Sequence, residues 1–536
     1  MKRKKPFNLI YEAEWNDIPC VDYPLTPQKW ASESIRPLVN THVDALFYNL
    51  CSSDGYCCQL ENGQILMDNF EKLGDAWVWR YRENTKRLIE AGANPPDMAV
   101  EFGRQLGIKV LPVVRMNDMH DMFFKYEVSQ FKLDNPQLLL GHGSYIDWEK
   151  GARGHPNLQS TDSFNWGMFD FAHDQVREHR LKIIEEFIIR WDNDGVSLDF
   201  DRDPWLFRQQ GVQKNANLIT DLIRRVRSVL DEQSSKRGKP QYLHVRLLPE
   251  IEVCWERGMD VARWVNEGLV DAVSPGCGYM TFSLDLEPWM KLVAGKDCWI
   301  YPSVNKWKVP AVARAWAKLM YQRGAHGLYL FNWGHLLYGF DKGNSPASER
   351  LGTVWYDELH PSYYEALNQI GNPDAIQYLD STYAMESIAH TLPEQGEAGK
   401  LARISRAQDA IALPIEMKVG RHCMNLPFAE DVQGARRRTF NPTVILRMKL
   451  NNYTVPDDFD VCINGTKLDA ASRRERAVFI MNNDTWIEYE VDPDVFVKGN
   501  NELEIDVHSL NPQMSTTPML MNVELVVKYV GGHQQS

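Results

Sequence analysis

The chain has 536 residues, of which 44% are hydrophobic and 24% charged, so it is expected to fold throughout and to exceed the size of a single core. Its net charge of -13, with no basic stripe to offset it, excludes a nucleic-acid partner. No segment approaches the roughly 20 apolar residues that span a bilayer, which excludes a membrane partner.

The chain starts with a basic run, Lys2–Lys5, which is typical of a solvated tail. The apolar segment that follows, Phe7–Tyr11, is too short for the core of a secretory signal, because Glu12 and Glu14 interrupt it. The nine cysteines are scattered and form no CxxC pair, which favours free thiols. We therefore expect a cytoplasmic protein.

Short apolar segments alternate with helical periods over the first two thirds of the chain. This alternation predicts a parallel sheet with right-handed crossovers. The predicted strands are Phe7–Tyr11, Ala45–Leu50, Val110–Val114, Val196–Phe200, Tyr242–Leu247, Ala272–Ser274, Trp299–Ser303 and Leu328–Phe331. The predicted helices are Met98–Leu106, Gln175–Trp191, Ala216–Leu230, Val261–Asn266, Pro288–Val293 and Val309–Arg323.

Glycines mark the ends of these units. Gly107 and Gly324 stand where a helix must stop before the next strand, and Gly195 separates a helix from a strand. Eight such units in about 370 residues match a (β/α)8 TIM barrel, whereas a doubly wound sheet would carry a glycine-rich phosphate turn after its first strand. The long connections over residues 51–95 and 115–173 are expected to build the site at the carboxyl rim of the barrel.

After about residue 373 the pattern changes to short, partly alternating runs separated by turns such as Asn464-Gly465. This pattern is typical of a β-sandwich. We therefore predict a catalytic barrel over residues 1–372 and an accessory sandwich over 373–536. Sixteen of the seventeen tryptophans precede residue 373, so the aromatic surface suited to sugars belongs mainly to the barrel. The predicted sandwich strands are Val444–Leu450, Phe459–Ile463, Ala477–Ile480, Trp486–Val491, Leu503–Val507 and Val523–Tyr529.

The fourth predicted strand carries the most informative residues. Side chains alternate along a strand, so Leu198 and Phe200 face the helices while Asp199 and Asp201 point into the barrel and its carboxyl mouth. A buried carboxylate needs partners, and at this end of a barrel strand it is typical of catalysis. The alternative is that Asp199 only pairs with an arginine to tie loops together.

The string DGVSLDFDRDPWLF around Asp199, preceded by FDFAHDQVREHRL and RMNDMHD, resembles the glycosyl hydrolase-like family-10 proteins of bacteria. The resemblance spans about residues 40 to 335, and it includes the strand of Arg246, the Gly258–Val261 turn and the Gly-Leu-Tyr-Leu-Phe-Asn segment that ends at Asn332. It implies a (β/α)8 barrel and a carbohydrate substrate.

The same strand also resembles that of the alpha-amylase superfamily, in which an Asp at this position is the nucleophile and a Glu after the next strand is the acid/base. By position, this resemblance makes Asp199 the nucleophile and Glu250 the acid/base, although Glu252 or Asp118 serves equally on the residues alone. Glycoside cleavage needs one protonated and one ionised carboxyl group.

The third strand ends in a polar turn, Arg115–Asp121, beside the predicted mouth. In it, Asn117 and Asp118 are suited to binding sugar hydroxyls, and His120 is a further candidate. The alternative is a turn whose groups satisfy one another. No HxH motif or other metal-ligand set occurs, so we expect neither a metal nor another cofactor, and chelation should leave the protein unchanged.

Amides, aromatics and charged groups after the other strands are placed to line the same mouth. Such a set suits sugars, whose C–H faces stack on rings while their hydroxyls take polar partners. The predicted lining residues are Asn49, Asp201, Arg202, Arg246, Tyr279, Asn305, Trp307, Asn332 and Trp333, with Trp148, Trp166 and Trp205 on the loops.

The sequence thus favours a glycoside hydrolase that uses paired carboxylates. Two alternatives stay open, because this barrel supports many chemistries: a carbohydrate-binding barrel without catalysis, and a lyase or isomerase that uses Asp199 as its base.

Overall fold

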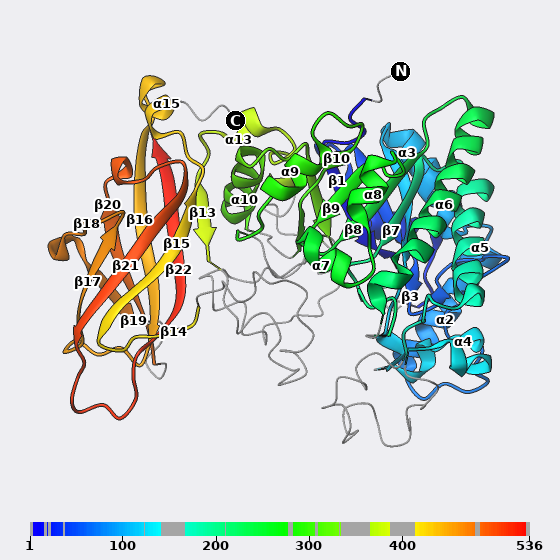
Figure 1. Ribbon diagram of the computed structural model, residues 1–536, viewed down its shortest axis with the longest axis horizontal. Helices are drawn as coiled ribbons and strands as arrows, with labels where there is room; N and C mark the ends of the chain where they lie inside the picture. Colours follow the sequence, from blue (N-terminus) through cyan, green and yellow to red (C-terminus); the bar gives the residue numbers. More distant parts are fainter. Residues whose placement is uncertain are drawn as a thin grey trace.

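A parallel barrel is followed by two antiparallel sheets (Figure 1). The structure is a computed structural model that describes residues 4–15, 19, 23–35, 38–122, 124–140, 167–208, 211–276, 282–305, 309–331, 333, 365–385, 413–477 and 483–531.

The first large sheet is parallel throughout and has the strand order β10-β9-β8-β7-β6-β2-β1-β12-β11. Its strands agree with the eight predicted apolar segments apart from shifts at their ends. They are β1 (Leu9–Glu14), β2 (Ala45–Asn49), β6 (Lys109–Arg115), β7 (Gly195–Asp199), β8 (Tyr242–Leu247), β9 (Ala272–Pro275), β10 (Trp299–Ile300), β11 (Ser303–Asn305) and β12 (Leu328–Phe331).

The two edges of this sheet meet in one segment of chain. β10 pairs with β9, and β11, which follows after only two residues, pairs with β12. Between them, the Tyr301 N–H donates to the Val273 carbonyl at 2.9 Å, and the Pro302 carbonyl accepts from the Tyr329 N–H at 3.0 Å. The sheet therefore closes on itself, and the predicted (β/α)8 barrel is confirmed.

Helices cover the outside of the barrel (Figure 1). Outward-facing strand residues pack against them, as Phe200 does beside the ring of Trp264, at 5.6 Å between centroids. The helices are α1 (Pro27–Ile35), α2 (Ala76–Glu90), α3 (Pro95–Leu106), α5 (Asp174–Arg190), α6 (Ala216–Arg237), α7 (Ile251–Glu256), α8 (Val261–Asn266), α9 (Glu287–Val293) and α10 (Pro310–Gln322).

Glycine is required where β7 meets β8. A Cβ atom added to Gly195, whose φ is +151°, would stand 2.0 Å from the carbonyl oxygen of Tyr242. This close approach sets the register that places Asp199 opposite Arg246. Gly107 ends α3 in the left-handed conformation, with φ of 68°, as the sequence predicted.

The barrel interior is apolar at its amino end and polar at its carboxyl end. Aromatic and aliphatic side chains fill the apolar part, for example Phe7, whose ring lies 5.4 Å from that of Phe47. Farther along β1, β6 and β7, the inward positions carry Glu12, Arg115 and Asp199. The site therefore rests on a packed floor.

The connections after β2 and β6 carry elements of their own, at the end of the barrel where the strands finish (Figure 1). They include a small sheet of β3 (Cys51–Ser52), β4 (Gly55–Tyr56) and β5 (Gln64–Ile65), and the helix α4 (Gln130–Asp134).

The C-terminal region is a sandwich of two antiparallel sheets, as predicted. The helices α13 (Pro373–Ile376) and α15 (Val432–Arg437) lie outside its sheets. The position of the domain boundary at residue 373 stays a prediction. One sheet has the order β13 (Ser381–Ala384), β22 (Met519–Val530), β16 (Asn441–Asn451), β20 (Asp484–Val491), β19 (Arg474–Ala477), and β14 (Ile415–Glu416) also pairs with β22. The other sheet has the order β15 (Gly420–Phe428), β21 (Gly499–Ser509), β17 (Asp458–Ile463), β18 (Thr466–Lys467).

Within the described ranges, no helix is long and apolar enough to cross a membrane.

Candidate active site

Four polar side chains occupy matching positions on four neighbouring barrel strands. Arg115 on β6 is level with Asp199 on β7, which is level with Arg246 on β8 and then Ser274 on β9. All four are buried. Because parallel strands end at the same edge of the sheet, this row forms one side of the carboxyl mouth.

Asp199 accepts three hydrogen bonds. Its Oδ1 atom accepts from the backbone N–H groups of Asp201 and Arg202, at 3.0 and 3.2 Å. Its Oδ2 atom accepts from the Arg246 guanidinium at 2.9 Å. The same guanidinium donates to Asp201 at 2.6 Å and lies 3.7 Å above the ring of Phe331. Asp199 is thus held rigidly.

Asp201 has less compensation for its burial than Asp199. Burial raises the pKa of Asp201 to about 7; the charge of Arg246 opposes this rise, and the charge of Asp199 adds to it. The Oδ1 atom of Asp201 is buried and has no hydrogen-bond partner among the residues that the structure describes.

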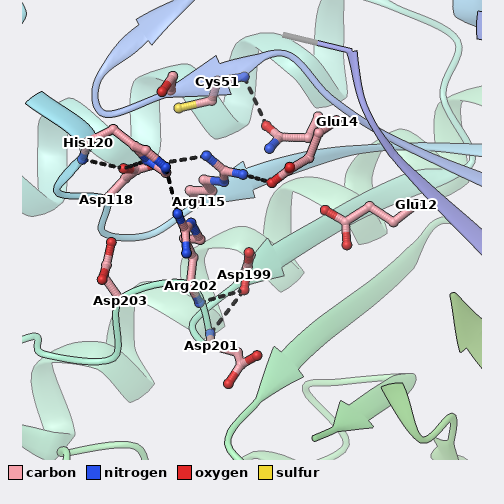
Figure 2. A network of polar contacts seen from close by, with 12 residues as sticks. Glu12, Glu14, Cys51, Arg115, Asp118, His120, Asp199, Asp201, Arg202 and Asp203 are labelled. Atoms are coloured by element: carbon pink, nitrogen blue, oxygen red, sulfur yellow. Dashed lines mark hydrogen bonds and ion pairs between the residues drawn. The ribbon is translucent and has the colours of Figure 1, made fainter. Parts of the chain in front are cut away.

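A second carboxyl group faces Asp199 from β1. Glu12 is fully buried, and burial raises its pKa to about 7; Arg246 opposes this effect, and the charge of Asp199 strengthens it. Its Oε2 atom accepts a hydrogen bond from the hydroxyl of Tyr329 on β12, while Oε1 has no partner in the described part of the chain. Figure 2 shows the Glu12 carboxyl pointing toward the space between Arg115 and Asp199.

A chain of polar contacts leads from the interior to the rim (Figure 2). The Arg115 guanidinium pairs with Glu14 and donates to Asp118 at 2.7 Å. The other oxygen of Asp118 contacts Nδ1 of His120 at 2.5 Å, and Nε2 of His120 lies 2.6 Å from the Arg202 guanidinium. His120, with a quarter of its side chain exposed, is the solvent-facing end of this chain.

Protonation states within the chain follow from these partners. Burial lowers the pKa of His120, so the ring is neutral and donates to Asp118 through Nδ1 while Nε2 accepts from Arg202. Burial alone would raise the pKa of Asp118, but His120 and Arg115 hold it well below its usual range. Asp203, which accepts from the Met119 N–H, has its pKa raised to about 7 by burial.

His244 contacts Ser274, which is one of the four residues level with Asp199. Its two ring nitrogens bond to the hydroxyls of Ser197 and Ser274, at 2.7 and 2.8 Å. Its ring is stacked on Tyr329, with 5.2 Å between centroids and 7° between planes. Burial holds the pKa of His244 well below its usual range, so the ring is neutral. It orients the tyrosine that contacts Glu12.

Other predicted site residues either make contacts away from Asp199 or lie outside the described residues. The amide nitrogen of Asn117 donates to the carbonyl oxygens of Phe169 and Trp205, and its amide oxygen accepts from the Phe169 N–H. Asn117 therefore ties two loops together. Glu250 stands at the N-terminus of α7, partly exposed. Trp333 is fully buried. Tyr279, Asn332, Trp148, Trp166 and Trp307 lie outside the described residues, as does the side chain of Asn305.

The two polar atoms of the Asn49 side chain differ in their hydrogen bonding. Its Oδ1 atom accepts from the Cys51 N–H at 2.9 Å, and its buried Nδ2 atom has no partner within the described ranges. The hydroxyl of Ser303 on β11 is likewise buried without one. Leaving such a group unpaired costs about 1–3 kcal/mol, so these atoms are ready for a polar ligand.

Sequence reasoning missed Glu12, Glu14 and Tyr329. The signal was present in the spacing of Ile10, Glu12 and Glu14, which alternate with Tyr11 and Ala13 in β1. Because the first strand was predicted to end at Tyr11, the two acids were interpreted only as an interruption of an apolar run.

Among the described residues, no group of three or more His, Cys, Asp or Glu side chains is arranged to hold a metal ion.

Comparisons with known proteins give structural similarities at low sequence identity. No family model matches the chain, and no curated protein matches it. The glycoside hydrolase domain of PgaB (BpsB) from Bordetella bronchiseptica is 10% identical, with a TM-score of 0.38, over 66% of this chain and 100% of that one. The chitinase ChiW from Paenibacillus sp. str. FPU-7 is 9% identical, with a TM-score of 0.38, over 95% of this chain and 52% of that one.

A GH18 chitinase from Pseudoalteromonas aurantia is 10% identical, with a TM-score of 0.31, over 62% of this chain and 96% of that one. These structural neighbours are glycoside hydrolases at low identity. The narrower resemblance to glycosyl hydrolase-like family-10 proteins stays a prediction.

Proposed function

We propose that this protein hydrolyses a glycosidic bond at the carboxyl mouth of the barrel, with Asp199 as the ionised carboxylate and Glu12 as the proton donor. One observation carries the proposal: the charges of Asp199 and Arg246 both act on the buried carboxyl group of Glu12, and the hydrogen-bond environments of the two carboxyl groups differ. Asp199 accepts hydrogen bonds from three donors, whereas burial raises the pKa of Glu12 to about 7, so that a substantial fraction of Glu12 carries a proton at neutral pH. A glycosidase needs such a difference between the environments of its acid and its base.

In the proposed reaction, Glu12 gives its proton to the leaving oxygen as the glycosidic bond breaks. Asp199 either attacks the anomeric carbon or takes a proton from the attacking water. The positive charge that develops on the sugar ring is stabilised by the carboxylate of Asp199. Tyr329 and Arg246 orient the two reacting groups.

The buried atoms without partners support a polyhydroxylated substrate. They include a carboxyl oxygen of Glu12, the amide nitrogen of Asn49 and the hydroxyl of Ser303, so both donors and acceptors are available. Sugar hydroxyls can fill either role. Arg115, His120, Arg202 and Asp201 would bind or orient the substrate near the rim.

Glu250 is the alternative acid, favoured by its position after the strand next to Asp199. A barrel that binds carbohydrate without cleaving it is the alternative function, favoured by the full hydrogen bonding of Asp199. A lyase or isomerase would use Asp199 as a base and would not need a protonated Glu12.

The test is a screen of natural polysaccharides, oligosaccharides and aryl glycosides with the wild-type protein, Glu12→Gln, Asp199→Asn and Glu250→Gln. We expect hydrolysis by the wild type and Glu250→Gln and none by Asp199→Asn. We expect Glu12→Gln to fail on substrates with an alcohol-like leaving group and to cleave only glycosides with an activated aryl leaving group. Binding without cleavage by the wild type would establish the binding barrel. Loss of activity in Glu250→Gln but not in Glu12→Gln would assign the acid to Glu250.

A further inference from the structure

Two pairs of aromatic rings flank α2; Phe124, Tyr23 and Trp79 are exposed, and Trp77 is partly buried. In one pair, Phe124 contacts Trp77, with 6.0 Å between ring centroids and 83° between the planes. In the other, Tyr23 contacts Trp79 at 4.7 Å and 55°. Phe124 is 46% exposed and Trp79 is 41% exposed. Exposed apolar side chains that gather in one place can mark a ligand-binding site.

Only the first pair adjoins the candidate active site. The backbone N–H of Phe124 donates to the carbonyl oxygen of His120 at 2.8 Å, and His120 is the solvent-facing end of the polar chain that starts beside Asp199. Phe124 belongs to the connection after β6, whereas Trp77 opens α2 after the connection that follows β2. The pair therefore joins two of the loops that surround the mouth.

The second pair lies on the opposite side of α2. Residues 77 and 79 are two positions apart on a helix, which turns them by about 200° from each other. Tyr23 lies under the guanidinium of Arg87, at 5.6 Å, and its loop is tied to the middle of the helix by Asn84, which accepts from the Leu25 N–H at 2.8 Å. This pair thus covers the outer flank of the helix.

We propose that Trp77 and Phe124 form an outer subsite that binds one sugar ring of an oligosaccharide chain whose scissile bond lies at Asp199. The proposal rests on the proposed function and adds an extended, chain-like substrate to it. Aromatic rings stack on the C–H faces of sugars without long-range charge, which suits a position beyond His120 and Arg202, where the hydroxyl-binding groups end.

The experiment measures binding and cleavage as a function of chain length. Cello-, malto- and chito-oligosaccharides of two to six units are titrated calorimetrically into the wild type, Phe124→Ala, Trp77→Ala and Trp79→Ala, and kcat/KM is measured for each oligomer that is cleaved. We expect Phe124→Ala and Trp77→Ala to lose about tenfold in affinity and kcat/KM for the longest oligomers but not for the shortest. Trp79→Ala, the matched control, should equal the wild type.

Three results would overturn the subsite. They are an equal loss at every chain length, an equal loss in Trp79→Ala, or a change from dimer to monomer in Phe124→Ala, which would show that a second copy of the chain covers the pair. Cleavage with no dependence on Phe124 would remove the subsite and leave the proposed function intact. Length-dependent binding without cleavage would support the subsite and contradict the proposed function. No binding of any oligosaccharide by the wild type would contradict the subsite and the proposed function together.

Discussion

The molecule contains two buried polar clusters that differ in how completely their hydrogen bonds are satisfied. At the barrel mouth, Glu12 and Asp201 each keep a buried oxygen without a partner among the described residues. Where α10 meets the sandwich, Lys318 and Glu430 form an ion pair at 2.7 Å and no such atom remains on either residue.

The cluster on α10 uses every available group. The Lys318 ammonium donates to the carbonyl of Leu379, the hydroxyl of Ser381 and Glu430. Glu430 also accepts from the hydroxyls of Tyr383 and Tyr529, at 2.8 and 2.6 Å. A satisfied network of this kind fixes one arrangement of neighbouring elements and is typical of structure.

At the mouth, by contrast, carboxyl groups are in excess over guanidinium groups. Of the described residues there, six carboxyl groups surround three guanidinium groups, and two of the guanidinium groups each bridge two carboxyls. Unpaired buried groups and raised pKa values are expected where a protein accepts lower stability in return for function. The carboxyls are Glu12, Glu14, Asp118, Asp199, Asp201 and Asp203, and the guanidinium groups belong to Arg115, Arg202 and Arg246.

The largest expected effect is on turnover at the mouth. Asp199→Asn keeps the shape of the side chain and removes its charge, so we expect activity to fall by at least about a thousandfold while the fold remains. Steady-state kinetics and thermal unfolding measure both quantities. Asp271→Asn is the control, because Asp271 is an equally buried partner of Arg227, at 2.8 Å, but lies before β9. If Asp199→Asn kept more than a tenth of the activity, Asp199 would not be catalytic.

The next largest effect is on stability at the α10 cluster. Lys318→Met leaves Glu430 buried without its cation, which should lower the free energy of unfolding by about 3–5 kcal/mol. Activity per folded molecule should not change. Urea denaturation measures the first quantity. Lys291→Met, which breaks an exposed pair with Glu287, should leave stability unchanged. An equal effect of the two substitutions would show that the α10 cluster is not a structural clamp.

Unlike Lys318→Met, Glu12→Gln should raise the free energy of unfolding at alkaline pH. Glu12 has a folded-state pKa of about 7 against an ordinary value of 4.5, so the folded state keeps a proton that the unfolded state loses as pH rises through this interval. Wild-type stability therefore falls between pH 4.5 and 7. At pH 8 the variant should be more stable than the wild type, by on the order of 1–3 kcal/mol, and at pH 4 the difference should shrink.

Urea denaturation at the two pH values measures this difference. Glu252→Gln, on the exposed side of α7, should show no pH-dependent gain. A gain of equal size at pH 4 and pH 8 would mean that folding does not change the pKa of Glu12.

The smallest effect concerns the hydroxyl of Tyr329. Its hydrogen bond lowers the pKa of Glu12 against the effect of burial, so Tyr329→Phe should raise that pKa. The alkaline limb of the kcat/KM profile should move to higher pH by up to about one unit. Tyr48→Phe, which removes a buried hydroxyl that contacts Asn193, is the control and should not move it. A shift to lower pH would remove Glu12 from the role of the acid.

The barrel strands could be predicted because strands buried on both faces carry continuous apolar runs. β8 and β12 have the predicted bounds, and β7 differs by one residue at each end. β15 was missed because its residues from Gly420 to Asn425 form no apolar run and only Leu426–Phe428 are fully buried. A one-sided edge strand of this kind gives a weak periodic signal.

The site could be predicted only in part, because its pairs join distant parts of the chain. Asp199 was found because a single strand carries its signal. Its relation to Glu12 depends on how the barrel closes, and closure brings β12 beside β1 although 317 positions separate Glu12 from Tyr329. Glu250 was assigned through a resemblance, by its position after the next strand, and such a position says nothing about where a loop directs its side chain.

The most direct test of the paired-carboxylate account measures Glu12→Gln on two substrates of the same sugar. A glycoside with a poor, alcohol-like leaving group needs the proton of the acid, whereas a dinitrophenyl glycoside does not. We predict that Glu12→Gln loses at least about a hundredfold in kcat/KM on the first and retains most of it on the second, while Asp199→Asn loses both. Equal losses on both substrates in Glu12→Gln would contradict the assignment of Glu12 as the proton donor.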